Sequence, residues 1–194
     1  LIGTPFNRRE ILQFATDIEG HPDNVAPAIF GGFTVNAVTN GRVDCFSFLP
    51  RFRMKFGVAV PNVPLATRMA RKVLPTEVPM KDAIFNIGRT SMLVAALTRC
   101  NERYLRLGLD YALHQPYRAE LIPGMYDVFK AARRAGAAGA TLSGAGPCLI
   151  AYVLERRHAE EAVGKAMLEA FRKHDVDARI LTLDLDTHGA QILK

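Results

Sequence analysis

Four polar side chains that could handle a phosphate group stand close together near the start of the sequence. In "EGHPDN", Glu19 offers a carboxylate for a cation, and His21 and Asn24 offer an imidazole and a carboxamide for hydroxyl groups. The sequence predicts a short helix that begins at Asp23 and is stopped by two glycines at 31–32. Free backbone N–H groups and the positive end of the helix dipole favour phosphate at such an N-terminus. The segment therefore has the chemistry of one wall of a phosphoryl-transfer site.

The same residues also have plainer interpretations. Asp23 or Asn24 would serve only as a helix cap, because Asp and Asn are among the commonest cap residues. His21 would then satisfy a local carbonyl. A zinc site is not favoured, because no other histidine stands at ligand spacing; the others are His114, His158, His174 and His188.

A glycine-rich segment, "GAAGATLSGAGP" at residues 136–147, is the second candidate. Its four glycines, among them Gly144 and Gly146 beside Ser143, would let the backbone approach a bound anion closely. A nucleophile elbow does not fit, because it requires glycine two residues before and two residues after the serine, and neither position around Ser143 is glycine. A dinucleotide fingerprint does not fit either, because Leu149 stands where it requires Gly or Ala. The alternative is a tight turn between two strands.

Two basic segments complete the set of candidate groups. In "TRMARKVLP", Thr67 and Arg71 lie four apart on one face of a predicted helix, so a hydroxyl and a guanidinium are offered together. In "HQPYRAELIPG", Arg118 is suited to bind a carboxylate through two hydrogen bonds. An ion pair with Glu120 or Asp110 would be an equally ordinary use of that arginine.

The elements that must position these groups alternate irregularly between helices and strands. The first helix is indicated by Ile11, Phe14, Ala15 and Ile18, and Asn40–Gly41 predicts a hairpin. Further strands are expected over 33–38, 43–49, 54–60, 148–154 and 178–185, and further helices over 65–74, 81–99, 102–109, 125–135 and 158–174.

A Gly/Ala loop is expected before the strand at 148–154, and the apolar run at 92–97 indicates a buried helix. This order of elements predicts an α+β fold in two layers, without repeats.

Composition narrows the classes of function. The net charge is +6, but the basic residues are spread along the chain without interleaved aromatic residues, which argues against nucleic acid. No apolar run is long enough for a membrane span, and no export signal is recognisable, so a soluble protein without a membrane partner is expected. Three cysteines, Cys45, Cys100 and Cys148, without C-x-x-C spacing fit a reducing cytoplasm.

The four motifs, in this order and spacing, resemble those of the homoserine kinases in the GHMP small-molecule kinase superfamily. The resemblance covers the whole chain and implies phosphorylation of the hydroxyl of L-homoserine on the route to threonine, with ATP and Mg²⁺. It also implies that residues 1–50 finish an N-terminal β-α-β nucleotide domain, and that residues 51–194 form a ferredoxin-like C-terminal domain. It leaves a homodimer open.

One motif of that family has no counterpart in the sequence. Such kinases carry an ATP-binding loop of the form P-x-x-x-G-L-G-S-S, and no segment of the 194 residues matches it. The chain also opens on Leu1 and not on Met. We therefore expect that it corresponds to the C-terminal two-thirds of such an enzyme and is inactive alone.

The resemblance implies roles for the candidate residues. Glu19 would face Mg²⁺, and His21 and Asn24 would line the homoserine pocket at the transferred phosphoryl group. The amino-acid head would be held by Thr67, Arg71 and Arg118, and the turn with Ser143, Gly144 and Gly146 would face the phosphate loop.

The resemblance also bears on the catalytic base. Related kinases place Asp where Asn24 stands, and an amide cannot usefully accept a proton. Catalysis by alignment and charge neutralisation is therefore expected, which suffices for a loose phosphoryl-transfer transition state. Asp23 is the rival candidate for a base.

Two other functions stay open. One is a sister GHMP kinase for another small molecule, such as mevalonate or a sugar, which should lack the paired arginines. The other is a non-catalytic ferredoxin-like module for binding or dimerisation.

Overall fold

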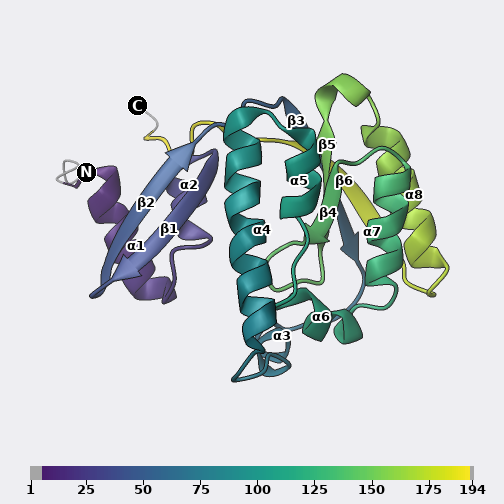
Figure 1. Ribbon diagram of the computed structural model, residues 1–194, viewed down its shortest axis with the longest axis horizontal. Helices are drawn as coiled ribbons and strands as arrows, with labels where there is room; N and C mark the ends of the chain where they lie inside the picture. The colour runs from purple at the N-terminus through teal and green to yellow at the C-terminus, as the bar shows by residue number, and fades with distance from the viewer. Residues whose placement is uncertain (1–5, 193–194) are drawn as a thin grey trace. The chain divides into compact units, whose positions relative to one another are not determined.

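The computed structural model describes residues 6–192, which divide into two compact units (Figure 1). Unit 1 is built from the residues up to Pro50 together with those from Leu185 onward, and unit 2 runs from Arg51 to Asp184. Each unit has its own core, so each is described separately.

Unit 1 contains two helices and a two-stranded antiparallel sheet. The helices are α1 (Arg8–Glu19) and α2 (Val25–Phe30), and the strands are β1 (Phe33–Thr39) and β2 (Arg42–Phe48). The strands pair in the register Thr39↔Arg42, so Asn40 and Gly41 alone form the connection. Both have positive φ, 51° and 77°, as a type I′ turn requires. The hairpin predicted from Asn40–Gly41 is confirmed.

Helix α1 is held at both ends and fastened to the hairpin. Asn7 and Glu10 form a reciprocal capping box, and Gly20 ends the helix in the left-handed conformation at φ 88°. The amide of Gln13 donates to the Gly41 carbonyl over 2.9 Å and accepts from the Val43 N–H over 3.1 Å. A single side chain thus ties the helix to the turn of the hairpin.

The core of unit 1 uses only Ala15 of the apolar stripe that indicated α1. Leu12 is 1% exposed and packs with Ala26 and Ile29, whereas Ile18 is 88% exposed. The predicted helix is present, but Ile11, Phe14 and Ile18 of the face expected from its periodicity are exposed.

Residues 185–192 belong to unit 1 because of a close approach between two glycines. A Cβ on Gly189 would lie 2.4 Å from the Ile29 carbonyl oxygen, and one on Gly31 would lie 2.7 Å from the Gly189 nitrogen. Backbone hydrogen bonds run alongside, from Gly32 N–H to the Asp186 carbonyl at 2.7 Å and from Ala190 N–H to the Ala28 carbonyl at 2.8 Å. The end of α2 is therefore fixed against a segment distant in sequence.

Unit 2 is centred on a four-stranded antiparallel sheet in the order β4-β5-β3-β6 (Figure 1). The strands are β3 (Met54–Pro61), β4 (Gly139–Leu142), β5 (Leu149–Leu154) and β6 (Ala178–Asp184). Strand β4 was expected to be a loop, and that prediction is wrong. Its four residues, "GATL", pair with β5 from Gly139↔Tyr152 to Leu142↔Leu149.

Helices α7 (Met125–Arg134) and α8 (Glu160–Arg172) pack on the sheet and on each other. Alternate residues of β5, among them Ala151 and Val153, are fully buried in the core that these helices share with the sheet. The helices contribute Val128, Phe129, Ala132, Val163, Met167 and Phe171 to that core. Burial of this apolar surface is the main stabilising force of unit 2.

A second helix pair, α4 (Met80–Arg99) and α5 (Glu102–Gly108), lies on the other side of the strands (Figure 1). The two helices touch at Gly108 of α5, which has no side chain. A Cβ there would lie only 2.6 Å from the Leu93 nitrogen of α4. Leu109, which follows α5, reaches the sheet at Gly139, where a Cβ would lie 2.5 Å from the leucine Cδ1. Glycine therefore allows both close approaches.

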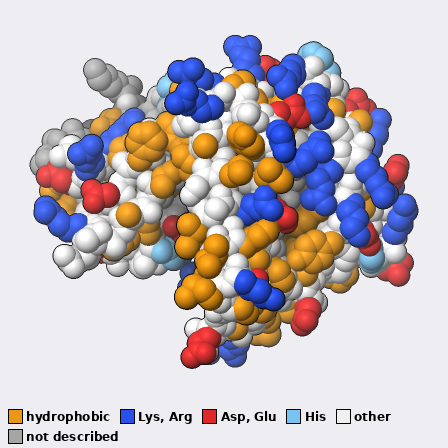
Figure 2. Space-filling view, in the orientation of Figure 1, with side chains coloured by type: hydrophobic (Ala, Val, Ile, Leu, Met, Phe, Trp, Pro, Cys, Tyr) orange, Lys and Arg blue, Asp and Glu red, His pale blue; other side chains and the backbone are white. Residues whose placement is uncertain are grey.

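Helix α4 is less buried than its sequence indicated. Of the run expected to be buried on nearly every side, only Ala96 and Leu97 are buried, and Met92 is 36% exposed. The exposed face continues through Ile84 and Ile87, and hydrophobic side chains show at the surface over this helix in Figure 2. The apolar run does not mark an interior helix in the described chain.

Short elements complete unit 2. They are α3 (Thr67–Lys72), α6 (Gln115–Arg118) and the 3₁₀ turns η1 (Ala119–Leu121) and η2 (Glu155–Arg157). The α+β fold class predicted from the order of elements is confirmed.

Candidate active site

The candidate residues of unit 1 lie at the connection between its two helices. Glu19 is the last residue of α1, His21 follows Gly20, and Asn24 stands at the N-cap position of α2. The Oε1 atom of Glu19 lies 3.8 Å from Nε2 of His21, and both side chains are partly exposed. A carboxylate and an imidazole are thus neighbours at an accessible helix junction.

Asn24 occupies a cap position without acting as a side-chain cap. Its own backbone is helical, with φ −97° and ψ −35°, and its side chain makes no capping hydrogen bond. Asn24 and Asp23 are both exposed. The interpretation that Asn24 merely caps α2 would need such a bond, so its carboxamide is available to a ligand.

Glu19 fits Mg²⁺ as one ligand among several. Within residues 6–192 there is no group of three His, Cys, Asp or Glu side chains arranged to hold a metal ion. Mg²⁺ commonly takes only one or two protein carboxylates and completes its shell with water and substrate phosphates. An exposed Glu19 carboxylate meets that requirement without a complete protein cage.

The candidate residues of unit 2 are brought together by Arg118. This arginine ends α6, and its Nε donates to the Ala70 carbonyl of α3 over 3.1 Å. Its Nη1 donates to the Gly144 carbonyl over 3.0 Å. Helix α3, which carries Thr67 and Arg71, and the glycine turn are therefore linked through one guanidinium.

Arg118 has no carboxylate partner in the described part of the chain. The ion pairs considered from the sequence, with Glu120 or Asp110, are not formed, and both of its hydrogen bonds go to neutral carbonyls. Burial lowers the pKa of Arg118, and the nearby positive charge of Arg71 lowers it further. The guanidinium groups of Arg71 and Arg118 are therefore close enough to repel each other.

The glycine-rich segment forms the tight turn between β4 and β5 that was the alternative to an anion loop. The Ser143 N–H donates to the Cys148 carbonyl over 2.8 Å, and the Gly146 N–H donates to the Ser143 carbonyl over 3.0 Å. Gly144 and Gly146 have φ values of 57° and 89°, which favour glycine. The open space around a Cβ position on Gly144 shows that its outer side is not packed by described residues.

Gln115 supports the same turn and was not singled out from the sequence. Its side chain is buried, and its Oε1 accepts the Leu142 N–H over 2.8 Å. The adjacent His114 has its pKa lowered by burial and, secondarily, by Arg118. A glutamine beside a proline in a turn-rich segment gives little sequence signal for such a role, because the partner is a backbone group of a distant strand.

The predicted residues therefore form two groups, one within each unit. Unit 1 holds Glu19, His21 and Asn24, and unit 2 holds Thr67, Arg71, Arg118, Ser143, Gly144 and Gly146. Within unit 2, Arg118 contacts both α3 and the turn.

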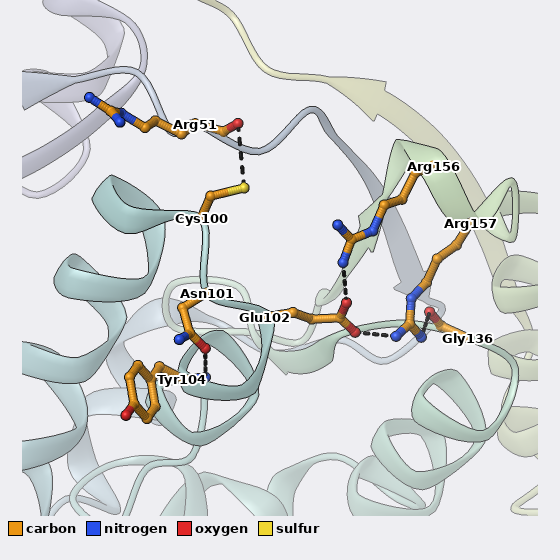
Figure 3. A network of polar contacts seen from close by, with 8 residues as sticks. All are labelled: Arg51, Cys100, Asn101, Glu102, Tyr104, Gly136, Arg156 and Arg157. Carbon is orange, nitrogen blue, oxygen red and sulfur yellow. Dashed lines mark hydrogen bonds and ion pairs between the residues drawn. The ribbon is translucent and has the colours of Figure 1, made fainter.

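A cavity of about 580 Å³ lies elsewhere in unit 2, among residues that include Arg53, Cys100 and Arg156. It contains none of the predicted site residues. Figure 3 shows the polar network beside it, in which the Glu102 carboxylate pairs with Arg156 at 2.6 Å and with Arg157. The single Glu102 carboxylate thus faces two guanidinium groups, and the network joins α5 to η2.

The surface charge agrees with the expectation of dispersed basic residues. In Figure 2, Lys and Arg side chains are scattered over the visible face with Asp and Glu between them. Among the described helices, none is both long and apolar enough to cross a membrane.

Comparison with known proteins gives one matching family and a consistent group of relatives. The family "GHMP kinases C terminal" matches residues 92–177. A homoserine kinase of Carboxydothermus hydrogenoformans is 41% identical over 97% of the chain, and one of Moorella thermoacetica is 42% identical over 100%. The chain spans only 60% and 64% of the length of these two relatives.

Solved structures give the same picture. The crystal structure of a homoserine kinase from Cytophaga hutchinsonii superposes with a TM-score of 0.90 at 27% identity, over 99% of the chain and 62% of the other. A galactokinase from Lactococcus lactis, at 16% identity and a TM-score of 0.61, shares the fold alone.

Proposed function

We propose that the chain is the C-terminal part of a GHMP kinase, and that it works in an enzyme that transfers the γ-phosphoryl group of ATP to the hydroxyl of L-homoserine. The observation that carries the choice of substrate is Arg118, whose partly buried guanidinium lies near Arg71. Arg118 itself has no carboxylate partner among the described residues. An α-amino acid supplies the missing carboxylate, whereas a neutral sugar does not.

In this proposal the chain provides substrate binding and part of the metal site. Arg71 and Arg118 hold the carboxylate, and Thr67 offers a hydroxyl on the same helix face as Arg71. His21 and Asn24 line the pocket beside the reacting hydroxyl, and Glu19 is the carboxylate that faces Mg²⁺. Bound Mg²⁺ would neutralise charge on the transferring phosphoryl group.

The nucleotide is proposed to bind mainly outside the 194 residues. The sequence has no P-x-x-x-G-L-G-S-S segment, and the chain spans less than two-thirds of the relatives' length. The Ser143–Gly146 turn is proposed to face that loop. Residues 1–50 would then finish the nucleotide domain, and residues 51–194 would form the C-terminal domain. Three free cysteines support a reducing cytoplasm as its location.

Thermal denaturation of the chain with added ligands tests the substrate. L-homoserine is expected to raise the melting temperature, because a ligand that binds only the folded state stabilises it. D-galactose serves as the neutral comparison, and ATP alone is expected to have little effect. An equal response to homoserine and galactose would favour a sister kinase, and no response to any ligand would favour a non-catalytic module.

The proposed reaction does not use a side-chain base. Asn24 cannot accept a proton usefully, so alignment and charge neutralisation carry the transfer. In an enzyme completed with the nucleotide-binding part, Asp23→Asn should retain kcat within a few-fold, whereas Glu19→Gln should lower it. Loss of turnover in the Asp23 variant, with unchanged fold and homoserine affinity, would instead identify Asp23 as the base.

A further inference from the structure

The hydrogen bonds of Arg118 leave only part of its guanidinium for a ligand. The group has five N–H donors, of which the Nε–H is used by the Ala70 carbonyl and one on Nη1 by the Gly144 carbonyl. A carboxylate cannot then bind along the Nε edge. The remaining donors are both on Nη2 and one on Nη1, so a substrate carboxylate would approach from the far end of the side chain.

The two carbonyls belong to elements that no other described hydrogen bond joins. Ala70 is the buried residue of α3, and Gly144 is the exposed residue at the tip of the turn between β4 and β5. A Cβ on Gly144 would meet nothing within 4 Å, so packing does not hold Gly144 itself, whereas a Cβ on Gly146 would lie 3.0 Å from Cδ1 of Ile122. Among the described residues, the bond from Arg118 is the hydrogen bond that holds Gly144 to the rest of the unit.

We propose that Arg118 is a positioning residue that fixes the Ser143–Gly146 turn to α3, and that a substrate carboxylate bound to its free end makes the turn more rigid. The second part of this inference rests on the proposed function. Binding at α3 would thereby be coupled to the order of the glycine turn, although the substrate does not touch the turn.

The substitution Arg118→Lys distinguishes a role in positioning the turn from simple attraction of an anion by positive charge. An ammonium keeps the positive charge that attracts a carboxylate, but its three N–H donors share one nitrogen and cannot reproduce the fixed separation at which Nε and Nη1 reach the two carbonyls. Arg118→Lys should therefore retain an anion site and lose the bridge. Arg157→Lys is the matched control, because Arg157 also donates to a glycine carbonyl, that of Gly136, at 3.2 Å.

Hydrogen exchange of the 194-residue chain tests the bridge without ligand. Arg118→Lys should speed exchange of the Ser143 and Gly146 amides at least tenfold, because the hydrogen bonds of the turn open more often. Exchange of the same amides should be unchanged in Arg157→Lys. Wild-type exchange at the turn in Arg118→Lys, with circular dichroism unchanged, would overturn the proposal.

A second arm tests the coupling with L-homoserine and with 3-aminopropan-1-ol, which lacks the carboxylate. Homoserine should slow exchange at the turn in the wild type and not in Arg118→Lys, and the amino alcohol should have no effect in either. Equal slowing by both compounds would refute the coupling. If homoserine fails to bind while Arg118→Lys still loosens the turn, the bridge stands and the proposed substrate is wrong.

Discussion

Two glycines in one helix pair should respond to alanine with opposite signs. A Cβ on Gly108 would lie 2.6 Å from the Leu93 nitrogen and 2.7 Å from its Cα, so Gly108→Ala forces the backbones of α4 and α5 apart. Overpacking of this kind costs roughly 1–3 kcal/mol. A Cβ on Gly88, in the middle of α4, would meet nothing within 4 Å. Gly88→Ala should therefore stabilise α4 by about 0.5–1 kcal/mol.

Urea unfolding of the full chain measures both changes. With a typical slope of about 2 kcal/mol/M, the midpoint of the transition that includes α4 should fall by roughly 0.5–1.5 M in Gly108→Ala and rise by roughly 0.25–0.5 M in Gly88→Ala. Far-ultraviolet circular dichroism follows the transition, and hydrogen exchange of α4 assigns it to unit 2. If Gly108→Ala proved as stable as the wild type, the close contact of α4 and α5 described above would be refuted.

Three further predictions, two substitutions and one titration, concern other parts of the chain. Gln115→Ala should destabilise unit 2 by about 1–3 kcal/mol in urea unfolding, because the buried Leu142 N–H loses its acceptor at 2.8 Å. Burial raises the pKa of Tyr152 to about 12, so the midpoint of its ultraviolet titration should lie about two pH units above that of an ordinary tyrosine. This tyrosine favours the folded state fully below about pH 10, and that contribution is lost as the pH rises toward 12. Gly41→Ala should weaken the hairpin by about 1–2 kcal/mol, because its φ of 77° is left-handed, and exchange of the β1 and β2 amides should rise.

Each of these has a clear contrary result. An unchanged urea midpoint in Gln115→Ala would mean that the Leu142 N–H finds another acceptor. If Tyr152→Phe loses absorbance change near pH 10 and not near pH 12, Tyr152 ionises with the other tyrosines and the raised pKa is refuted. Unaltered exchange in Gly41→Ala would exclude a left-handed residue at that position of the turn.

Local signals predicted the elements better than they predicted the contacts. Asn40–Gly41 specified the hairpin because its turn type needs two residues with positive φ. Strand β4 was missed because "GATL" has a glycine, an alanine and only four residues, and it becomes a strand through pairing with β5. The apolar periodicity of α1 found the helix but not its buried face, since Leu12 lies outside the predicted stripe.

The candidate site shows the same limit. The residue types around Arg118 suggested an anion site, and the choice between a carboxylate ligand and a protein carboxylate could not be made from sequence. In the structure, Arg118 bonds the carbonyls of Ala70 and Gly144, which any residue types could supply. Every residue type carries the same backbone groups, so the sequence does not indicate which carbonyl or N–H a side chain will bond. Neither the bonds of Arg118 to two carbonyls nor the bond of Gln115 to the Leu142 N–H was therefore predictable.

The return of residues 185–192 to unit 1 makes unit 2 an insertion within it, and this sets an order of folding. If unit 1 closed first, it would have to bring together ends separated by more than a hundred unfolded residues, at an entropic cost of roughly 4 kcal/mol. Once β3 and β6 pair, Lys55 lies opposite Asp184, and both connections leave unit 2 from neighbouring strands. The folded inserted unit then holds the two parts of unit 1 close together in place of a long flexible loop. During synthesis, unit 1 would make its contacts with residues 185–192 last, after the inserted unit has folded and Gly189 has emerged to meet Gly31.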